Sequence, residues 1–360
     1  MATITGQINP FPVIRVYFEN LAKTAIQKQD RGIVYLVLQD ETAPTELYTT
    51  FLSPSDINAA KWTADNVKLL NTCYEVFSPY KVVVRRRLKV ATVLEPIQDI
   101  LAEFETRKMT HLAIPEITSQ DDAVVVAWVK SFIETKGTVY ASTFANNTDS
   151  CSVVEINNDV MEHSVITNYT PAKFAVMLVC AMAGCPLNRS LDNVTFPTLT
   201  YVDSVTPVNG KFSMYMDDEK VRVKLAINSK TTFDSTYKEN TRYIKIWEGI
   251  NIIRFDIQET FKDYWLGLYL NTYENKVAFC DIVNKVYFPS ITPNVLSPDF
   301  NNYVKVDWEA HKAYVVLDGG NPDTMTEAQL KQYPTNGDVI LTGEVRFTNS
   351  MISLDLRIMY

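Results

Sequence analysis

The chain has 360 residues, of which 46% are hydrophobic and 21% are charged, and its formal net charge is −8. This composition is typical of a globular protein and argues against disorder, and the length predicts two domains. The acidic balance argues against a nucleic-acid-binding face, so we expect no nucleic-acid partner.

Neither the N-terminus nor the longest apolar run has the features of an export signal or a membrane-spanning helix. Residues 1–10 lack the basic and apolar regions of a signal peptide. The longest apolar run, residues 174–184, is shorter than the roughly 20 residues that a membrane-spanning helix needs. We therefore expect a soluble protein that is made in the cytoplasm and makes no membrane contact.

The five cysteines are an odd number, which favours free thiols in a reducing compartment. Cys180 and Cys185 lie close together in the sequence. A zinc site would need two more ligands nearby, and none of the three histidines (His111, His163, His311) is near them. Core packing is the favoured interpretation, and no metal site is predicted.

An alternating segment lies near the start of the chain. Residues 11–19 place Ile14, Val16 and Phe18 on one side of a predicted strand. A single strand is not stable by itself. We expect this strand to add to a sheet, either in its own chain or in another.

Strands and helices alternate between residues 32 and 143. This order predicts a largely parallel sheet with helices on both faces. Ligands of such folds bind beyond the carboxyl ends of the strands. No glycine-rich phosphate loop occurs there, so no cofactor is predicted. The predicted strands are residues 32–38, 82–90, 111–114 and 138–143, and the predicted helices are residues 56–73, 96–107 and 119–135.

Three consecutive arginines, Arg85, Arg86 and Arg87, form the most basic run of the chain. They lie in a predicted strand and follow valines. We interpret them as part of a strand with one polar face, in preference to a phosphate-binding groove.

A long amphipathic helix dominates the second half of the chain. Its apolar face runs from Ile244 to Tyr264, with an apolar residue at every third or fourth position, and its opposite face carries polar residues from Arg242 onwards. Other predicted helices are residues 171–184, 274–286 and 326–332. Predicted β-segments are residues 196–205, 211–215, 221–227, 302–308 paired with 311–317, 338–347 and 352–359.

The last predicted strand has a regular apolar face, formed by Ile352, Leu354, Leu356 and Ile358. With the strand at residues 11–19, it gives the chain two β-capable arms. Such arms could link subunits by adding a strand to a neighbour's sheet, which would produce a polymer. Pairing within their own domain is an equal alternative from the residues alone.

The residues do not assemble a catalytic site. His163 and His311 have no serine in a nucleophile-elbow motif near them, because that motif is absent from the sequence. We predict that the protein is not an enzyme. The alternative of a different class is an enzyme or ligand-binding protein that uses the α/β domain.

Several motifs of the C-terminal half occur in the order found in one known family. The chain resembles the sheath proteins of contractile phage tails, in particular the small two-domain type of Gram-positive prophages and R-type bacteriocins. The resemblance covers roughly residues 169–360, and Arg31 to Val34 is its one recognisable point before them. The motifs are residues 184–190 (GCPLNRS), 226–232 (AINSKTT), 245–257, 261–267 (FKDYWLG), 271–276 (NTYENK) and 337–343 with Met351.

The resemblance implies an α/β outer domain inserted into an α+β inner domain. The outer domain would be residues 22–197. The inner domain would combine an N-terminal arm, residues 1–21, with residues 198–360, which end in the C-terminal β arm. Ile14, Val16, Phe18, Ile352, Leu354, Leu356 and Ile358 would be the strand-exchanging residues of the two arms.

The resemblance also implies a structural function. Subunits would stack as six-membered rings around a tail tube and contract to drive the tube through the target envelope. The partners would be further copies of the chain, the tube protein, and baseplate and tail terminator proteins, in a virion tail or bacteriocin particle assembled in the host cytoplasm. Lys238, Arg242 and Lys245, at the start of the long helix, are the candidate tube-facing residues. A baseplate or other structural tail component is the alternative.

Overall fold

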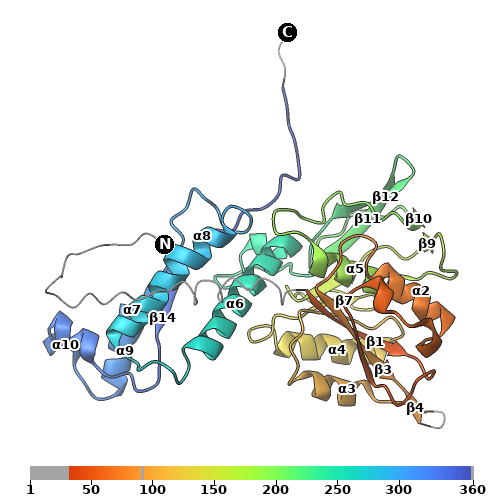
Figure 1. Ribbon diagram of the computed structural model, residues 1–360. Helices are drawn as coiled ribbons and strands as arrows, with labels where there is room; N and C mark the ends of the chain where they lie inside the picture. The colour runs from red at the N-terminus through yellow and green to blue at the C-terminus, as the bar shows by residue number, and fades with distance from the viewer. Residues whose placement is uncertain (1–31, 91–92, 358–360) are drawn as a thin grey trace, which may run out of the picture. The chain divides into compact units, whose positions relative to one another are not determined.

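The computed structural model describes residues 32–90 and 93–357 (Figure 1). The described chain divides into two compact units. The first, called here the α/β unit, contains residues 32–255, 291–302 and 344–357 within the described ranges. The second, called here the helical unit, contains Asp256–Ser290 and Tyr303–Gly343.

An eight-stranded sheet organises the α/β unit, with the strand order β12-β11-β8-β7-β6-β1-β3-β2. The six central strands pair in parallel, and the edge pairs β11–β12 and β2–β3 are antiparallel. The large parallel sheet expected from the sequence is therefore confirmed. The strands are β1 (Ile33–Gln39), β2 (Tyr48–Phe51), β3 (Lys81–Arg87), β6 (His111–Ala113), β7 (Val139–Ser142), β8 (Val153–Ile156), β11 (Lys211–Asp217) and β12 (Lys220–Leu225).

Helices cover both faces of this sheet, so the unit has two hydrophobic cores. Alternate side chains of β1 point into different cores, as the two-residue period of a strand requires. Val34, Leu36 and Leu38 join the core that contains α5. Ile33, Tyr35 and Val37 join the core that contains α3 and α4. The helices are α2 (Ala64–Thr72), α3 (Ile97–Phe104), α4 (Ser119–Ser131) and α5 (Pro171–Gly184), and the small strand pairs are β4 (Lys89–Val90) with β5 (Val93–Leu94) and β9 (Met161–His163) with β10 (Leu199–Val202).

The division into compact units does not follow the predicted domain boundary at residue 197. β11 pairs in parallel with β8, with Lys211 opposite Glu155, so it extends the large sheet. The outer edge of β12 is in turn covered, because Phe196 donates its N–H to the Val221 carbonyl. Residues on both sides of the predicted boundary therefore share one sheet, and the expected domain insertion stays a prediction.

The predicted long amphipathic helix is confirmed as α6 (Ile244–Tyr264). Its first residues belong to the α/β unit and its last residues to the helical unit. Ile244 and Trp247 are buried in the α/β core. The apolar face of α6 that the sequence predicts therefore packs against the α/β core at the N-terminal end of the helix.

The helical unit consists of short helices and a two-stranded sheet (Figure 1). The sheet pairs β13 (Tyr303–Val306) with β14 (Leu341–Glu344), whose last residue belongs to the α/β unit. A π-helix, η5 (Val283–Tyr287), continues α7 without a break. The helices are α7 (Tyr273–Ile282), α9 (Trp308–Leu317) and α10 (Glu327–Gln332), and α8 (Phe288–Ile291) follows η5.

One predicted element of this unit is wrong. Residues 302–308 and 311–317 were expected to form a β-hairpin, but the second of these segments is helix α9. Asp307 explains the helix, because its side chain caps it by accepting a hydrogen bond from the Ala310 N–H at 3.0 Å. The alternation before residue 307 does form a strand, β13, and this strand pairs with β14.

Candidate assembly site

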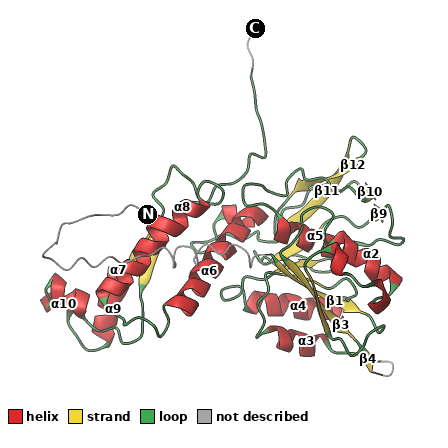
Figure 2. Cartoon of the chain, viewed as in Figure 1, coloured by secondary structure: helices red, strands yellow, loops and turns green. Residues whose placement is uncertain are grey.

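The described C-terminal residues form an exposed segment without secondary structure (Figure 2). Met351 is 100% exposed, Leu354 is 87% exposed and Leu356 is 66% exposed, and Ile352 is 47% exposed. The strand predicted over residues 352–359 is therefore not formed within the described chain. Alternating apolar residues define the two faces of a strand, but a strand also needs a neighbouring strand to pair with. A row of exposed apolar side chains is typical of a surface that binds another molecule.

The other predicted arm residues cannot be placed in the same way. Ile14, Val16, Phe18 and Ile358 lie outside the described residues. The strand-exchange role of both arms therefore stays a prediction at these positions.

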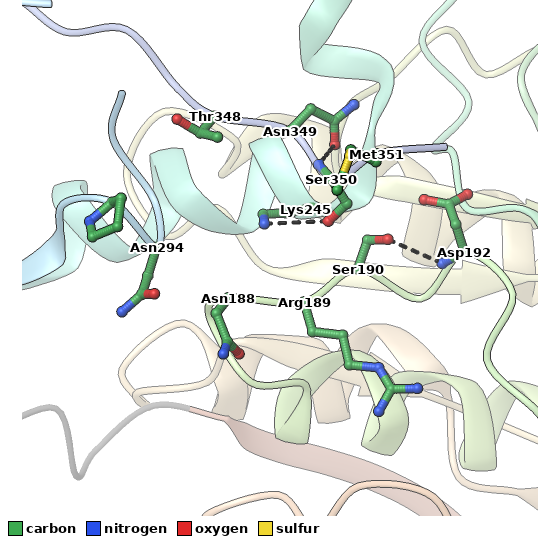
Figure 3. Close-up of a pocket in the computed structure, with 11 residues that line it drawn as sticks. Asn188, Arg189, Ser190, Asp192, Lys245, Asn294, Thr348, Asn349, Ser350 and Met351 are labelled. Carbon is green, nitrogen blue, oxygen red and sulfur yellow. Dashed lines mark hydrogen bonds between the residues drawn. The ribbon is translucent and has the colours of Figure 1, made fainter. Parts of the chain in front are cut away.

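The C-terminal segment leaves the α/β unit at Ser350. Before this residue the main chain is hydrogen-bonded to residues 291–302: Ser297 donates to the Arg346 carbonyl at 2.7 Å, and Thr348 donates to the Val295 carbonyl at 2.9 Å. At Ser350 itself, the Lys245 ammonium donates to the hydroxyl Oγ at 3.3 Å (Figure 3). Ser350 is thus the last point at which a described hydrogen bond holds the segment.

A pocket of about 450 Å³ surrounds this exit point (Figure 3). It brings together residues that carried the family resemblance in three separate motifs: Asn188 to Ser190, Lys245 and Met351. Burial lowers the pKa of the Lys245 ammonium. The pocket is lined by Asn188, Arg189, Ser190, Asp192, Lys245, Pro293, Asn294, Thr348, Asn349, Ser350 and Met351.

The three candidate tube-facing residues do not form one exposed basic patch. Lys238 is exposed. Arg242 is half-buried, lies 3.6 Å from Glu239 and stacks over the Tyr243 ring. Lys245 points to Ser350 in the pocket. Of the three, only Lys238 has the exposure that a contact with a separate protein requires, and its role stays a prediction.

A close approach fixes the pairing of β13 with β14. A Cβ atom added to Gly343 would lie 2.4 Å from the Tyr303 carbonyl oxygen and 3.0 Å from a methyl group of Val304. No side chain fits at that distance, so glycine is required here. Sequence reasoning recognised Gly343 as part of a motif but did not identify this constraint.

Ion pairs lie at the end of β3, on the carboxyl edge of the parallel sheet, the edge where ligands of such folds bind. Arg85 and Arg86 are almost completely buried. The arginines lie in a strand, β3, as interpreted, but they do not form its polar face, because all three are buried and paired with carboxylates from other segments. The pairs are Arg85 with Glu95 and Glu103 at 2.7 Å, Arg86 with Asp40 at 3.0 Å and Arg87 with Asp121 at 2.8 Å.

Among the residues that the structure describes, no group of three or more His, Cys, Asp and Glu side chains is placed to hold a metal ion. No described helix is both long and apolar enough to span a bilayer. The five cysteines are free thiols, and Cys180 is buried in the core around α5, as its core-packing interpretation requires.

Comparison with known proteins identifies the fold. No family model matches the chain. A tail sheath protein of Clostridium phage phiCD119 is 24% identical over 359 residues, which cover 96% of this chain and 98% of that protein. A sheath tail protein from Listeria innocua superposes with a TM-score of 0.67 at 12% identity, over 92% of this chain and 99% of that structure. The chain has the tail sheath protein fold.

A further structural match covers the full length of the chain. The helical sheath of the anti-feeding prophage in its contracted state matches with a TM-score of 0.67 at 14% identity, over 100% of this chain and 99% of that one. The resemblance to tail sheath proteins that the sequence motifs indicated is therefore confirmed.

Proposed function

We propose that this chain is the structural subunit of a contractile tail sheath. The similarity to a phage tail sheath protein along 96% of the chain supports this function. The match to a sheath in its contracted state, over the full chain, supports contraction. Buried ion pairs at the carboxyl edge of the parallel sheet fit a scaffold better than a ligand-binding domain.

The observation that carries the proposal is the exposed C-terminal segment. Ile352, Leu354 and Leu356 have exposed apolar side chains, and their spacing would place them on one face of a strand. Full burial of each would contribute about 1.5–3 kcal/mol. In the proposed assembly this burial occurs when the segment adds as a strand to the β13–β14 sheet of another copy, where main-chain hydrogen bonds join the two subunits.

The finer features of the proposal come from the family resemblance. Subunits stack as six-membered rings around a tail tube, and contraction drives the tube through the target envelope. The N-terminal arm, residues 1–21, and residues 198–360 form the inner domain, and residues 22–197 form the outer domain. The partners are further copies of the chain, the tube protein, and baseplate and tail terminator proteins of a virion tail or bacteriocin particle.

Deletion of residues 352–360 tests the role of the C-terminal segment. We expect the shortened chain to keep its circular dichroism spectrum and melting temperature, because residues 352–357 are exposed and form no helix or strand. It should sediment as a monomer under conditions in which the full chain forms large polymers. A shortened chain that polymerises like the full one would falsify strand exchange by this segment.

A further inference from the structure

Two cysteine thiols of the α/β unit are hydrogen-bonded to each other. Cys73 caps the C-terminus of α2, and Cys180 lies within α5. A side-chain hydrogen bond joins the two thiol groups. Helices α2 and α5 contact each other on one side of the large sheet, as Figure 1 shows. The two sulfur atoms therefore face each other across this helix pair.

The thiol pair is buried in the hydrophobic core around α5. Cys73 is 1% exposed and Cys180 is 0% exposed, and both belong to the same core. Burial raises the pKa of the Cys180 thiol well above its ordinary value. The thiolate is the form that reacts in disulfide chemistry, and few molecules carry a Cys180 thiolate at neutral pH. We therefore expect the pair to oxidise slowly, through local opening of the core.

The other three cysteines have no cysteine partner in the described part of the chain. Cys151 donates to a threonine hydroxyl at 3.6 Å, and Cys185 donates to two main-chain carbonyl oxygens. Cys280 lies in α7 of the helical unit. Among the described cysteines, all of which are free thiols, only Cys73 and Cys180 are placed for a disulfide with each other.

We propose that Cys73 and Cys180 form a reversible disulfide when the chain passes from a reducing to an oxidising environment. In this step two S–H bonds break and one S–S bond forms. The two protons and two electrons pass to dioxygen, which becomes hydrogen peroxide. A thiol reductant reverses the step by thiol–disulfide exchange.

The disulfide would close a long loop within the α/β unit. The chain between Cys73 and Cys180 includes strands β3, β6, β7 and β8 of the large sheet. A cross-link over a loop of this length restricts the unfolded chain and so stabilises the folded one. Such a bond suits a particle that is assembled in a reducing cytoplasm and acts outside it. That use rests on the proposed function, whereas the reaction itself does not.

Counting free thiols by mass spectrometry tests the proposal. Purified full-length protein is treated in its folded state with diamide, whose N=N bond takes up the two protons and two electrons. The protein is then unfolded and alkylated with N-ethylmaleimide. We expect the untreated chain to take up five maleimide groups and the oxidised chain three, because the disulfide removes two thiols. Digestion should release one linked peptide pair that contains Cys73 and Cys180, and dithiothreitol should restore the uptake of five groups.

Two results would overturn the proposal. The oxidised chain could still take up five groups, or its linked peptides could join other cysteines. Either result leaves the proposed function standing, because sheath assembly is observed separately by electron microscopy. Failure of a chain with the expected disulfide to assemble would contradict the proposed function instead.

Two serine variants provide a matched comparison. Cys73→Ser should keep all four of its thiols after diamide treatment, whereas Cys151→Ser, which also changes a buried cysteine, should lose two of four. Loss of two thiols from Cys73→Ser would show that a different pair reacts. If Cys73→Ser does not fold, the linked peptides of the unmodified chain still decide which cysteines react.

The melting temperature measures the effect of the disulfide on stability. Oxidation should raise the melting temperature of the unmodified chain by about 5–10 °C, because the closed loop is long. It should leave that of Cys73→Ser unchanged. An equal shift in both proteins, or no shift in either, would contradict the stabilising role of the disulfide.

Discussion

Asp40 and Arg86 form an ion pair in which both side chains are completely buried. Burial acts to raise the pKa of the Asp40 carboxyl, but hydrogen bonds from Asn66, Thr63 and Thr42 outweigh it and lower the pKa to about 2. Because this folded-state pKa lies below the ordinary value of 3.8, the carboxylate stabilises the fold above pH 4. That stabilisation is lost as the pH falls through about 2.

We therefore predict that Asp40→Asn changes both stability and its pH dependence. At neutral pH the free energy of unfolding should fall by about 3–5 kcal/mol, because Arg86 keeps its charge in a buried position without a carboxylate. Between pH 4 and pH 2 the variant should lose less stability than the unmodified chain. Urea denaturation across this pH range measures both effects. Asp65→Asn is the control, since Asp65 is 82% exposed, and equal effects of the two substitutions would contradict the prediction.

Gly343 gives a second prediction for a single residue. Gly343→Ala should lower the free energy of unfolding by roughly 1–3 kcal/mol, because the new methyl group overlaps the Tyr303 carbonyl and separates β13 from β14. Gly337→Ala is the matched control, since nothing lies within 4 Å of the added Cβ there. Thermal denaturation compares the two variants. Equal melting temperatures would show that the strand pair tolerates the methyl group.

At the scale of single elements, sequence reasoning succeeded where local signals decide the structure. Helix α5 occupies residues 171–184 as predicted, because Thr170 caps it and Pro171 is its first residue. Helix α9 was missed, since Tyr314, Val315 and Val316 favour strands by composition. Residues 308–317 form a helix because Asp307 caps its N-terminus and its buried side chains pack in the helical conformation.

The start of α6 offers a prediction about tube contact. Lys238→Glu should weaken co-sedimentation of the chain with tail tubes, because Lys238 is exposed just before this helix. It should leave the melting temperature unchanged. Lys220→Glu, on the β11–β12 hairpin, is the control of equal charge change at an exposed site. If both variants bind tubes like the unmodified chain, Lys238 is not a tube-facing residue.

At the scale of the whole molecule, contacts between distant segments limited what the sequence could show. The alternation of elements was enough to predict the parallel sheet. It could not show that β11 adds to β8 across the predicted boundary at residue 197. Likewise, the sequence around Arg86 could not show that its charge is paired with Asp40, which lies far away in the sequence. The alternation in residues 352–356 is a local signal, and it identified side chains that are exposed in the structure, but the strand that they were expected to form is absent from the described chain and their role in assembly stays a prediction.

The most direct test is negative-stain electron microscopy of the purified full-length chain, with and without its tail tube. We predict long hollow cylinders that show sixfold symmetry when viewed along their axis, and that enclose the tube when it is present. A folded chain that remains monomeric at high concentration and does not coat the tube would contradict the assignment as a contractile sheath subunit.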